Sequence, residues 1–277
     1  PYVVANSSGT KELPTGPLGV LKEPVVGSLG EDQIVALTLA AMNECQVEFG
    51  DLRLGVDYDR MLFTKDTSLS RSGFRSSQGM GLRVVCQGNW GFAATSDLSA
   101  DGIRAAVRQA VQLAKWVSAA QGDRRGPFHE TFVREPAHQG EFHTPGLMCP
   151  LSAPAQDVVA PLLEAAQIAA GVNGIKRSDG FVMIHGQRRR IANTEGLSVL
   201  KTHVVVDSSL KFIAVKDRAA AYRTLVSPAM AGGYEHLLES DFPGQAQKAA
   251  EEAVAKCTAK VPISGDYDLI LDPHNLA

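Results

Sequence analysis

The sequence predicts an α+β fold in which antiparallel strands are flanked by helices, and in which a helix–strands–helix pattern occurs twice. Two observations support this prediction. Segments with helical periodicity enclose segments that alternate apolar and polar residues, and a tight hairpin signal joins two of the strand segments. The 277 residues are 44% apolar and 21% charged, as in ordinary globular proteins, which excludes a disordered or collagen-like chain.

The first unit is predicted over residues 31–122, after an extended arm of residues 1–30 that contains several prolines and glycines. Apolar residues recur at helical spacing from Glu31, and acidic residues lie in the first turn, where the helix dipole favours them. An alternating pattern over residues 52–58 then predicts a strand with one buried face.

Two further apolar runs in this unit are separated by Gln87-Gly88-Asn89. We expect a hairpin turn there, with Gly88 supplying a positive φ. Ser99 offers an N-cap to a second helix, which is expected to end near Gly122.

Residues 123–152 are predicted to form an irregular connector with one short strand near residues 131–133. The second helix–sheet–helix unit is placed at residues 153–260, with helices over about 155–170 and 241–256. Residues 261–277 are predicted to hold a closing strand. The two units resemble one another only weakly in sequence, so that an internal repeat and a chance similarity both remain open.

Charge and cysteine content restrict the class of protein. Lys and Arg total 27 against 30 Asp and Glu, a net charge of −3, which offers no field for a polyanion, so no nucleic-acid partner is expected. The sequence has neither a long apolar run nor a signal-peptide pattern, and we expect no membrane association. A reducing cytoplasm is expected because the four cysteines are widely spaced and form no CxxC pair: Cys45, Cys86, Cys149 and Cys257.

Several motifs invite a functional interpretation that their context weakens. Gly79-Met80-Gly81 resembles the start of a dinucleotide fingerprint, but a strand follows it, so the glycines are expected to permit a bulge or a close backbone approach. Arg188-Arg189-Arg190 is expected to solubilise an exposed strand, with anion contact as the alternative. Trp90 either lines a groove or, as we expect, covers the core of the sheet.

The histidines offer no clear metal site. His129, His138 and His143 lie among glutamates, but in a Pro-containing loop whose spacing does not suit one helix face, so a solvated polar loop is expected. His185 and His203 each lie in a strand pattern and receive no role. The sequence therefore predicts no catalytic, cofactor-binding or metal-binding residue in these 277 residues.

Three consecutive segments resemble the N-terminal domain of the TldD/PmbA family of zinc metallopeptidases. They are the run from Gly79 to Val85, the run Gly88-Asn89-Trp90-Gly91-Phe92-Ala93-Ala94-Thr95, and the Ala-rich helix that follows. Asn193-Thr194-Glu195-Gly196 matches a later family segment. Residues 269–273 resemble the strand before the family's catalytic helix. The resemblance covers about residues 31–277 and is most specific over residues 79–95.

The resemblance implies a two-domain protein in which an N-terminal α/β domain precedes a mainly β catalytic domain. The family's zinc motif, His-Glu-x-x-x-His, is absent from this sequence, and zinc is expected only in the full-length protein. A family member is expected to act on unstructured or precursor peptides in the cytoplasm, as a homodimer or a heterodimer. We expect the 277 residues alone to be inactive, and both chain ends to differ from natural gene ends.

Three hypotheses follow from the resemblance. The chain is the N-terminal part of such a peptidase, or it comes from the metal-free partner subunit of a heterodimeric peptidase, or it acts alone as a binding module. The sequence beyond Ala277 separates the first two hypotheses, because only the first requires the zinc motif there.

Overall fold

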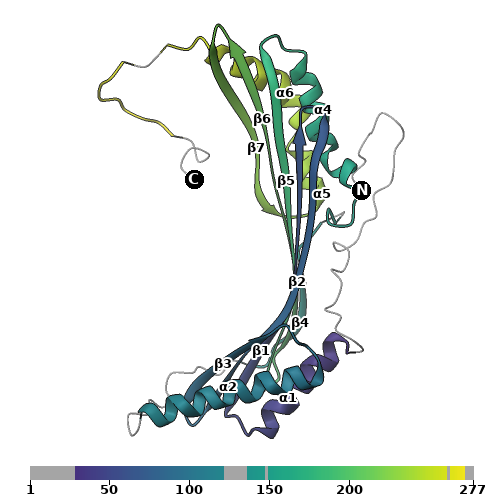
Figure 1. Ribbon diagram of the computed structural model, residues 1–277, viewed down its shortest axis with the longest axis vertical. Helices are drawn as coiled ribbons and strands as arrows, with labels where there is room; N and C mark the ends of the chain where they lie inside the picture. Colours follow the sequence, from purple (N-terminus) through teal and green to yellow (C-terminus); the bar gives the residue numbers. More distant parts are fainter. Residues whose placement is uncertain (1–28, 122–135, 147–148, 261–262, 272–277) are drawn as a thin grey trace.

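The computed structural model describes residues 29–121, 136–146, 149–260 and 263–271, and Figure 1 shows how its elements are arranged. Most of the predicted arm lies outside the described residues, and so does all of the predicted short strand near residues 131–133. In chain order the elements are α1 (Glu31–Glu44), β1 (Phe49–Lys65), β2 (Ser68–Cys86), β3 (Asn89–Thr95), α2 (Ala100–Gln121), β4 (Gln139–His143), α4 (Ala155–Ala170), β5 (Ile175–Asn193), β6 (Ser198–Lys216), β7 (Ala219–Ala231), α5 (Tyr234–Glu239) and α6 (Phe242–Lys256).

The strands form one seven-stranded sheet in the order β3-β2-β1-β5-β6-β4, with β7 also paired to β6. Every pairing is antiparallel except that of β4 with β6. The predicted fold class is confirmed, and so is the double helix–strands–helix pattern. The two patterns share a continuous sheet, because β1 of the first pairs with β5 of the second over 15 residue pairs. The division into separate units stays a prediction.

The four central strands are long enough to serve both ends of the molecule. β1, β2, β5 and β6 are 17 to 19 residues long, and helices cover the sheet at its two ends, with a narrow waist between them (Figure 1). Side chains of α1 and α2 form one apolar core with the sheet, and side chains of α4, α5 and α6 form the other. Both cores use even-numbered strand residues, such as Leu52, Leu82 and Phe212.

The opposite face of the sheet carries the odd-numbered residues of these four strands. We call it the open face, because most of its side chains are exposed or half-buried from Arg53 to Lys65 on β1 and from His185 to Arg189 on β5. Trp90 lies on this face, 40% exposed, with its ring packed edge-on against Phe49. Phe49 and its strand partner Val85 form a small buried cluster on this face, so Trp90 covers that cluster and neither of the two cores under the helices.

The local predictions are largely confirmed. Gln87 and Gly88 have φ values of 52° and 71° in the turn between β2 and β3. Ser99 caps α2, because its Oγ accepts a hydrogen bond from the Gly102 amide at 3.2 Å. The helix expected over residues 241–256 is α6, and four of its alanines are buried: Ala246, Ala249, Ala250 and Ala253.

Two predictions fail because strands depend on distant partners. Within the predicted connector, residues 139–143 form β4, a strand that the sequence did not predict at this place, beside the first residues of β6. Residues 269–271 form no strand, and Ile270 is 99% exposed. An apolar run becomes a strand only when another strand lies beside it, and none of the described strands pairs with this one.

The expectation that Arg188-Arg189-Arg190 solubilises an exposed strand is also wrong. β5 is a central strand, so it needs no solubilising side chains. Arg188 is 5% exposed and its Nε donates to Glu31 Oε2 at 2.8 Å, while Arg190 Nη2 lies 2.8 Å from Asp32 Oδ1. The first turn of α1 thus supplies carboxylates to two arginines of β5. Arg189 points to the other face, as the strand alternation predicts.

Candidate functional site

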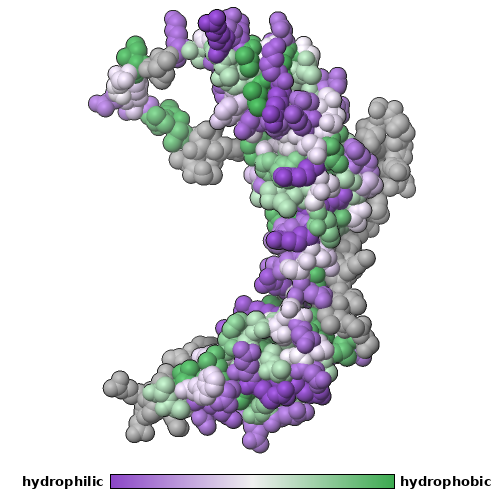
Figure 2. Space-filling model, in the orientation of Figure 1, coloured by the Kyte–Doolittle hydropathy of each residue, from purple (hydrophilic) through white to green (hydrophobic). Residues whose placement is uncertain are grey.

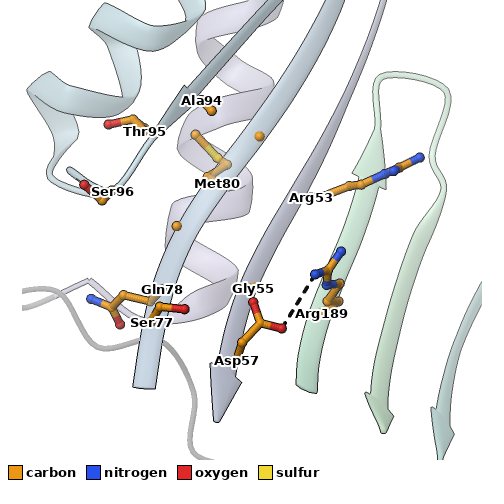
Figure 3. Close-up of a pocket in the computed structure, with 12 residues that line it drawn as sticks. Arg53, Gly55, Asp57, Ser77, Gln78, Met80, Ala94, Thr95, Ser96 and Arg189 are labelled. Carbon is orange, nitrogen blue, oxygen red and sulfur yellow. Dashed lines mark ion pairs between the residues drawn. The ribbon is translucent and has the colours of Figure 1, made fainter. Parts of the chain in front are cut away.

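A hollow of about 550 Å³ lies on the open face, between β1, β2 and the end of β3 (Figure 3). Its floor is poor in side chains, because Gly55 and Gly79 are direct partners in the β1–β2 ladder and Gly81 follows on the same face. Arg53 and Arg189 lie on the β5 side of the hollow, and Ser77 lies on the side of β2.

The glycines of the floor also permit close backbone approaches. A Cβ atom on Gly79 would lie 3.1 Å from the carbonyl oxygen of Thr95, and one on Gly55 would lie 3.4 Å from that of Arg188. Gly79-Met80-Gly81 is thus part of a strand, and the expectation of a close approach within the sheet is confirmed.

The charges at this hollow are unequal. Arg189 Nη2 lies 3.6 Å from Asp57 Oδ1, and the side-chain amide nitrogen Nε2 of Gln187 donates a hydrogen bond to the same oxygen at 2.8 Å. Arg53 is exposed and forms no ion pair with any residue that the structure describes. Arg53 is therefore a cation of the hollow that no described carboxylate pairs, and it can bind an anionic or hydrogen-bond-accepting group.

A polar network continues from the hollow to the waist of the sheet. His185 Nδ1 lies 2.8 Å from Asp59 Oδ1, and Arg75 Nη2 lies 2.7 Å from Asp59 Oδ2. The hydrogen bonds from His185 and Arg75 lower the pKa of Asp59, while burial and the nearby Lys201 and His185 lower the pKa of His203. Figure 2 shows hydrophilic residues gathered at this waist. The carboxylates of this network are already paired within the chain, so the network joins neighbouring strands to one another.

The histidines proposed from the sequence are dispersed. His143 Nδ1 lies 2.7 Å from Thr202 Oγ1 and its Nε2 lies 3.2 Å from Glu141, His138 is exposed, and His129 lies outside the described residues. Within the described part of the chain, no group of three or more His, Cys, Asp or Glu side chains could hold a metal ion. The residues described here therefore do not fit the zinc site that the family resemblance implies.

The segment Asn193-Thr194-Glu195-Gly196 forms the turn between β5 and β6. The side chain of Asn193 accepts hydrogen bonds from the amides of Glu195 and Leu197, and Gly196 has a φ of 96°. Thr194 Oγ1 accepts a hydrogen bond from the amide of Gly50 at 3.1 Å. In this chain the motif joins two long strands and anchors their turn to β1.

Sequence reasoning proposed no site residues, and it missed the hollow and the network at the waist. The signal was present in part. Asp57 and Asp59 lie two residues apart on β1, and His185 and Arg189 lie four residues apart on β5. Even spacings of this kind place polar side chains on one face of a strand. The direct pairing of β1 with β5, which brings the two sets together, has no local signal.

Comparison with known proteins places this fold. Residues 50–114 match the family model for PmbA/TldA metallopeptidase domain 1. A metalloprotease from Methanothermobacter thermautotrophicus is 26% identical over 235 residues, which cover 83% of this chain and 48% of that protein. The chain thus spans about half the length of this curated relative.

Solved structures share the architecture. A Thermotoga maritima protein described as a candidate modulator of a DNA gyrase aligns with a TM-score of 0.64 and 15% identity, over 84% of this chain and 50% of that one. TldE from Thermococcus kodakarensis aligns with a TM-score of 0.54 and 16% identity, over 81% of this chain and 47% of that one. At these identities the likeness establishes the fold alone.

The fold is therefore that of the first domain of TldD/TldE-like proteins. The resemblance to the TldD/PmbA family, first drawn from residues 79–95, is confirmed. None of the helices in the described residues is long and apolar enough to cross a membrane.

Proposed function

We propose that this chain is the N-terminal part of a TldD/PmbA-like zinc metallopeptidase that cleaves unstructured or precursor peptides. The observation that carries the proposal is the match of residues 50–114 to a metallopeptidase first domain. The metalloprotease relative supports it further, and the aligned segment covers 48% of that protein.

In this proposal the zinc ligands come from outside the described residues, which contain no fitting donor set. Zinc held by two histidines of a His-Glu-x-x-x-His helix would activate a water molecule for peptide hydrolysis. The present chain would contribute the long sheet, its open face and part of a dimer interface. It would be inactive alone and would act in the cytoplasm.

A second candidate is the metal-free partner subunit of a heterodimeric peptidase of this type. The similarity in fold to TldE supports this candidate, because a chain of this fold can belong to either kind of subunit. Such a subunit would complete the enclosure around a peptide without supplying the metal.

The test compares the 277-residue chain with the protein encoded by the whole reading frame. We expect the longer protein to retain one zinc ion per chain and to cleave a denatured protein substrate, with loss of cleavage in a chelator. We expect the 277-residue chain to do neither. Chelator-sensitive cleavage by the 277-residue chain would contradict the assignment of the ligands to other residues. A longer protein that retains no zinc but restores cleavage to a second, zinc-bearing subunit would favour the partner-subunit alternative.

A further inference from the structure

The two outer edges of the sheet differ in a way that points to a binding site. The outer edge of β6 is covered twice, by β4 over Ser198–Thr202 and by β7 over Val205–Lys216. The corresponding strand of the first unit, β2, pairs with β3 only over Met80–Cys86. Among the described residues, no strand pairs with the outer edge of β2 before Met80, and β2 is the last strand of the sheet there (Figure 1).

Backbone groups along this edge are directed outward. The carbonyl oxygen of Val85 accepts a hydrogen bond from the amide of Glu48 at the start of β1, so Val85 directs its polar groups toward β1. The β1–β2 register is unbroken between Arg71 and Val85, and polar groups alternate sides along an antiparallel strand. Ser72, Phe74 and Ser76 therefore direct their amide and carbonyl groups away from β1, and their side chains are exposed.

Two hollows lie at the ends of this edge. The hollow of about 550 Å³ includes Ser77, and a second hollow, of about 410 Å³, includes Ser70, Arg71, Lys65 and Arg177. Both lie on the open face, beside the edge rather than under the helices. An extended polypeptide paired with residues 72–76 would have a hollow at each end for its side chains.

The charged side chains that line the two hollows favour an acidic partner. The carboxylates that line the hollows are already paired, Asp57 with Arg189 and Asp179 with Arg177. Arg53, Lys65 and Arg71 have no carboxylate partner among the described residues, although Arg71 lies over the ring of Phe63 at 4.0 Å. The region therefore holds an excess of cations in a protein with a net charge of −3.

We propose that the outer edge of β2 between Ser72 and Ser76 binds an extended, acidic segment of another polypeptide, which adds a strand to the sheet. Backbone hydrogen bonds supply the pairing, and Arg53, Lys65 and Arg71 supply the preference for acidic side chains. The inference goes beyond the proposed function, because this pairing requires neither metal nor cleavage.

A second copy of the chain is a poorer occupant of the same edge. Antiparallel pairing of two β2 edges would bring Arg71 and Arg75 of one copy beside those of the other, and residues 68–79 contain no acidic residue to compensate. Like charges across paired strands destabilise the pairing. An acidic segment removes this repulsion.

The test measures binding of a fluorescent eight-residue peptide of alternating Glu and Thr to the 277-residue chain, by anisotropy at low salt. The matched probe replaces each Glu by Lys. We expect the acidic probe to bind at least tenfold more tightly than the basic probe, and its Kd to rise when the salt is raised to about 0.5 M. Absence of detectable binding of the acidic probe, or equal binding of both probes, overturns the proposal.

Edge pairing is tested with Ser76→Pro, which removes an outward amide without touching the β1 ladder, and with Ser76→Thr, which keeps that amide. We expect a roughly three- to tenfold weaker Kd for Ser76→Pro and a Kd within about twofold of the parent for Ser76→Thr. Equal binding by the two variants contradicts strand addition. Circular dichroism checks that both variants are folded.

Two further measurements decide the matter if Ser76→Pro does not fold. Arg71→Glu is expected to weaken binding of the acidic probe at least tenfold, and the acidic probe is expected to slow amide hydrogen exchange over residues 72–76 in the parent chain. Unchanged exchange there overturns the proposal. Sedimentation that shows a dimer, with exchange over residues 72–76 already slow without the probe, assigns the edge to a second copy instead.

Discussion

His185 Nδ1 lies 2.8 Å from Asp59 Oδ1, and these two residues are direct partners in the antiparallel ladder of β1 and β5. This ladder continues for eight residue pairs on one side of them and for six on the other, toward the two helix-covered ends of the sheet. The pair therefore lies on the open face near the waist, while the neighbouring Ile184 belongs to the core formed with α4, α5 and α6 on the other face. On the open face, polar contacts between strands take the place of apolar packing.

Replacement of Asp59 by Asn tests this contact. Hydrogen bonds from His185 and Arg75 lower the pKa of Asp59 below its ordinary value of 3.8. A carboxyl whose pKa is lowered by folding stabilises the protein above its unfolded pKa, and the contribution is lost as the pH falls through the folded pKa. Asp59→Asn should be less stable than the parent at pH 7, by up to about 1 kcal/mol for this partly exposed pair. Urea unfolding from pH 2.5 to 7 measures it, and a difference that does not shrink below pH 3.8 would argue against the assignment.

The buried pair of Glu31 and Arg188 should matter more. Both side chains are 5% exposed, so removal of the carboxylate by Glu31→Ala leaves a guanidinium buried near the start of α1. We expect a loss of about 3–5 kcal/mol in the free energy of unfolding. Asp32→Ala is the matched control, because Asp32 is 84% exposed and pairs with Arg190, and it should cost less than about 1 kcal/mol. Similar losses for the two variants in urea unfolding would show that burial does not govern this site.

The contact between β3 and α2 leaves no room at Gly91. A Cβ atom there would lie 1.9 Å from the carbonyl oxygen of Ala110 and 2.8 Å from the amide nitrogen of Ala114. Both are backbone atoms of the helix, so α2 must move, and Gly91→Ala should destabilise the protein by about 1–3 kcal/mol or prevent folding. Gly73→Ala is the control, since its nearest contact is at 3.9 Å. Thermal melts of both variants test this, and equal melting temperatures would refute the close approach.

Tyr234 joins α5 to α4. Its hydroxyl donates to the carbonyl oxygen of Asp157 at 2.5 Å, and burial raises the pKa of Tyr234 to about 12. A raised pKa stabilises the fold below the unfolded value, 10.0, and that contribution is lost as the pH rises toward 12. Tyr234→Phe should lose about 0.5–1.5 kcal/mol at pH 7 and show a weaker loss of stability above pH 10. Urea unfolding at pH 7 and pH 10.5 measures both effects; an alkaline loss as steep in Tyr234→Phe as in the parent would exclude Tyr234 as its source.

The sequence predicted what neighbouring residues determine. Helical periodicity located α4 at residues 155–170, and Gln87-Gly88 carried the positive φ values of a hairpin turn. It could not predict contacts between distant residues. Glu31 and Arg188 are 157 positions apart, and the pairing of β1 with β5 places residues 188–190 on a central strand, where Arg188 is buried. The hollow above Gly55 and Gly79 depends on the same register.

The most direct test of the proposed function is the gene sequence after the codon for Ala277. We expect a His-Glu-x-x-x-His motif within roughly the first dozen codons, because such a motif supplies two imidazole ligands and a Glu, and residues 1–277 do not contain it. A continuation of the TldD/PmbA type without the motif would transfer the chain to the metal-free subunit. A stop codon or an unrelated domain at that point would contradict the account.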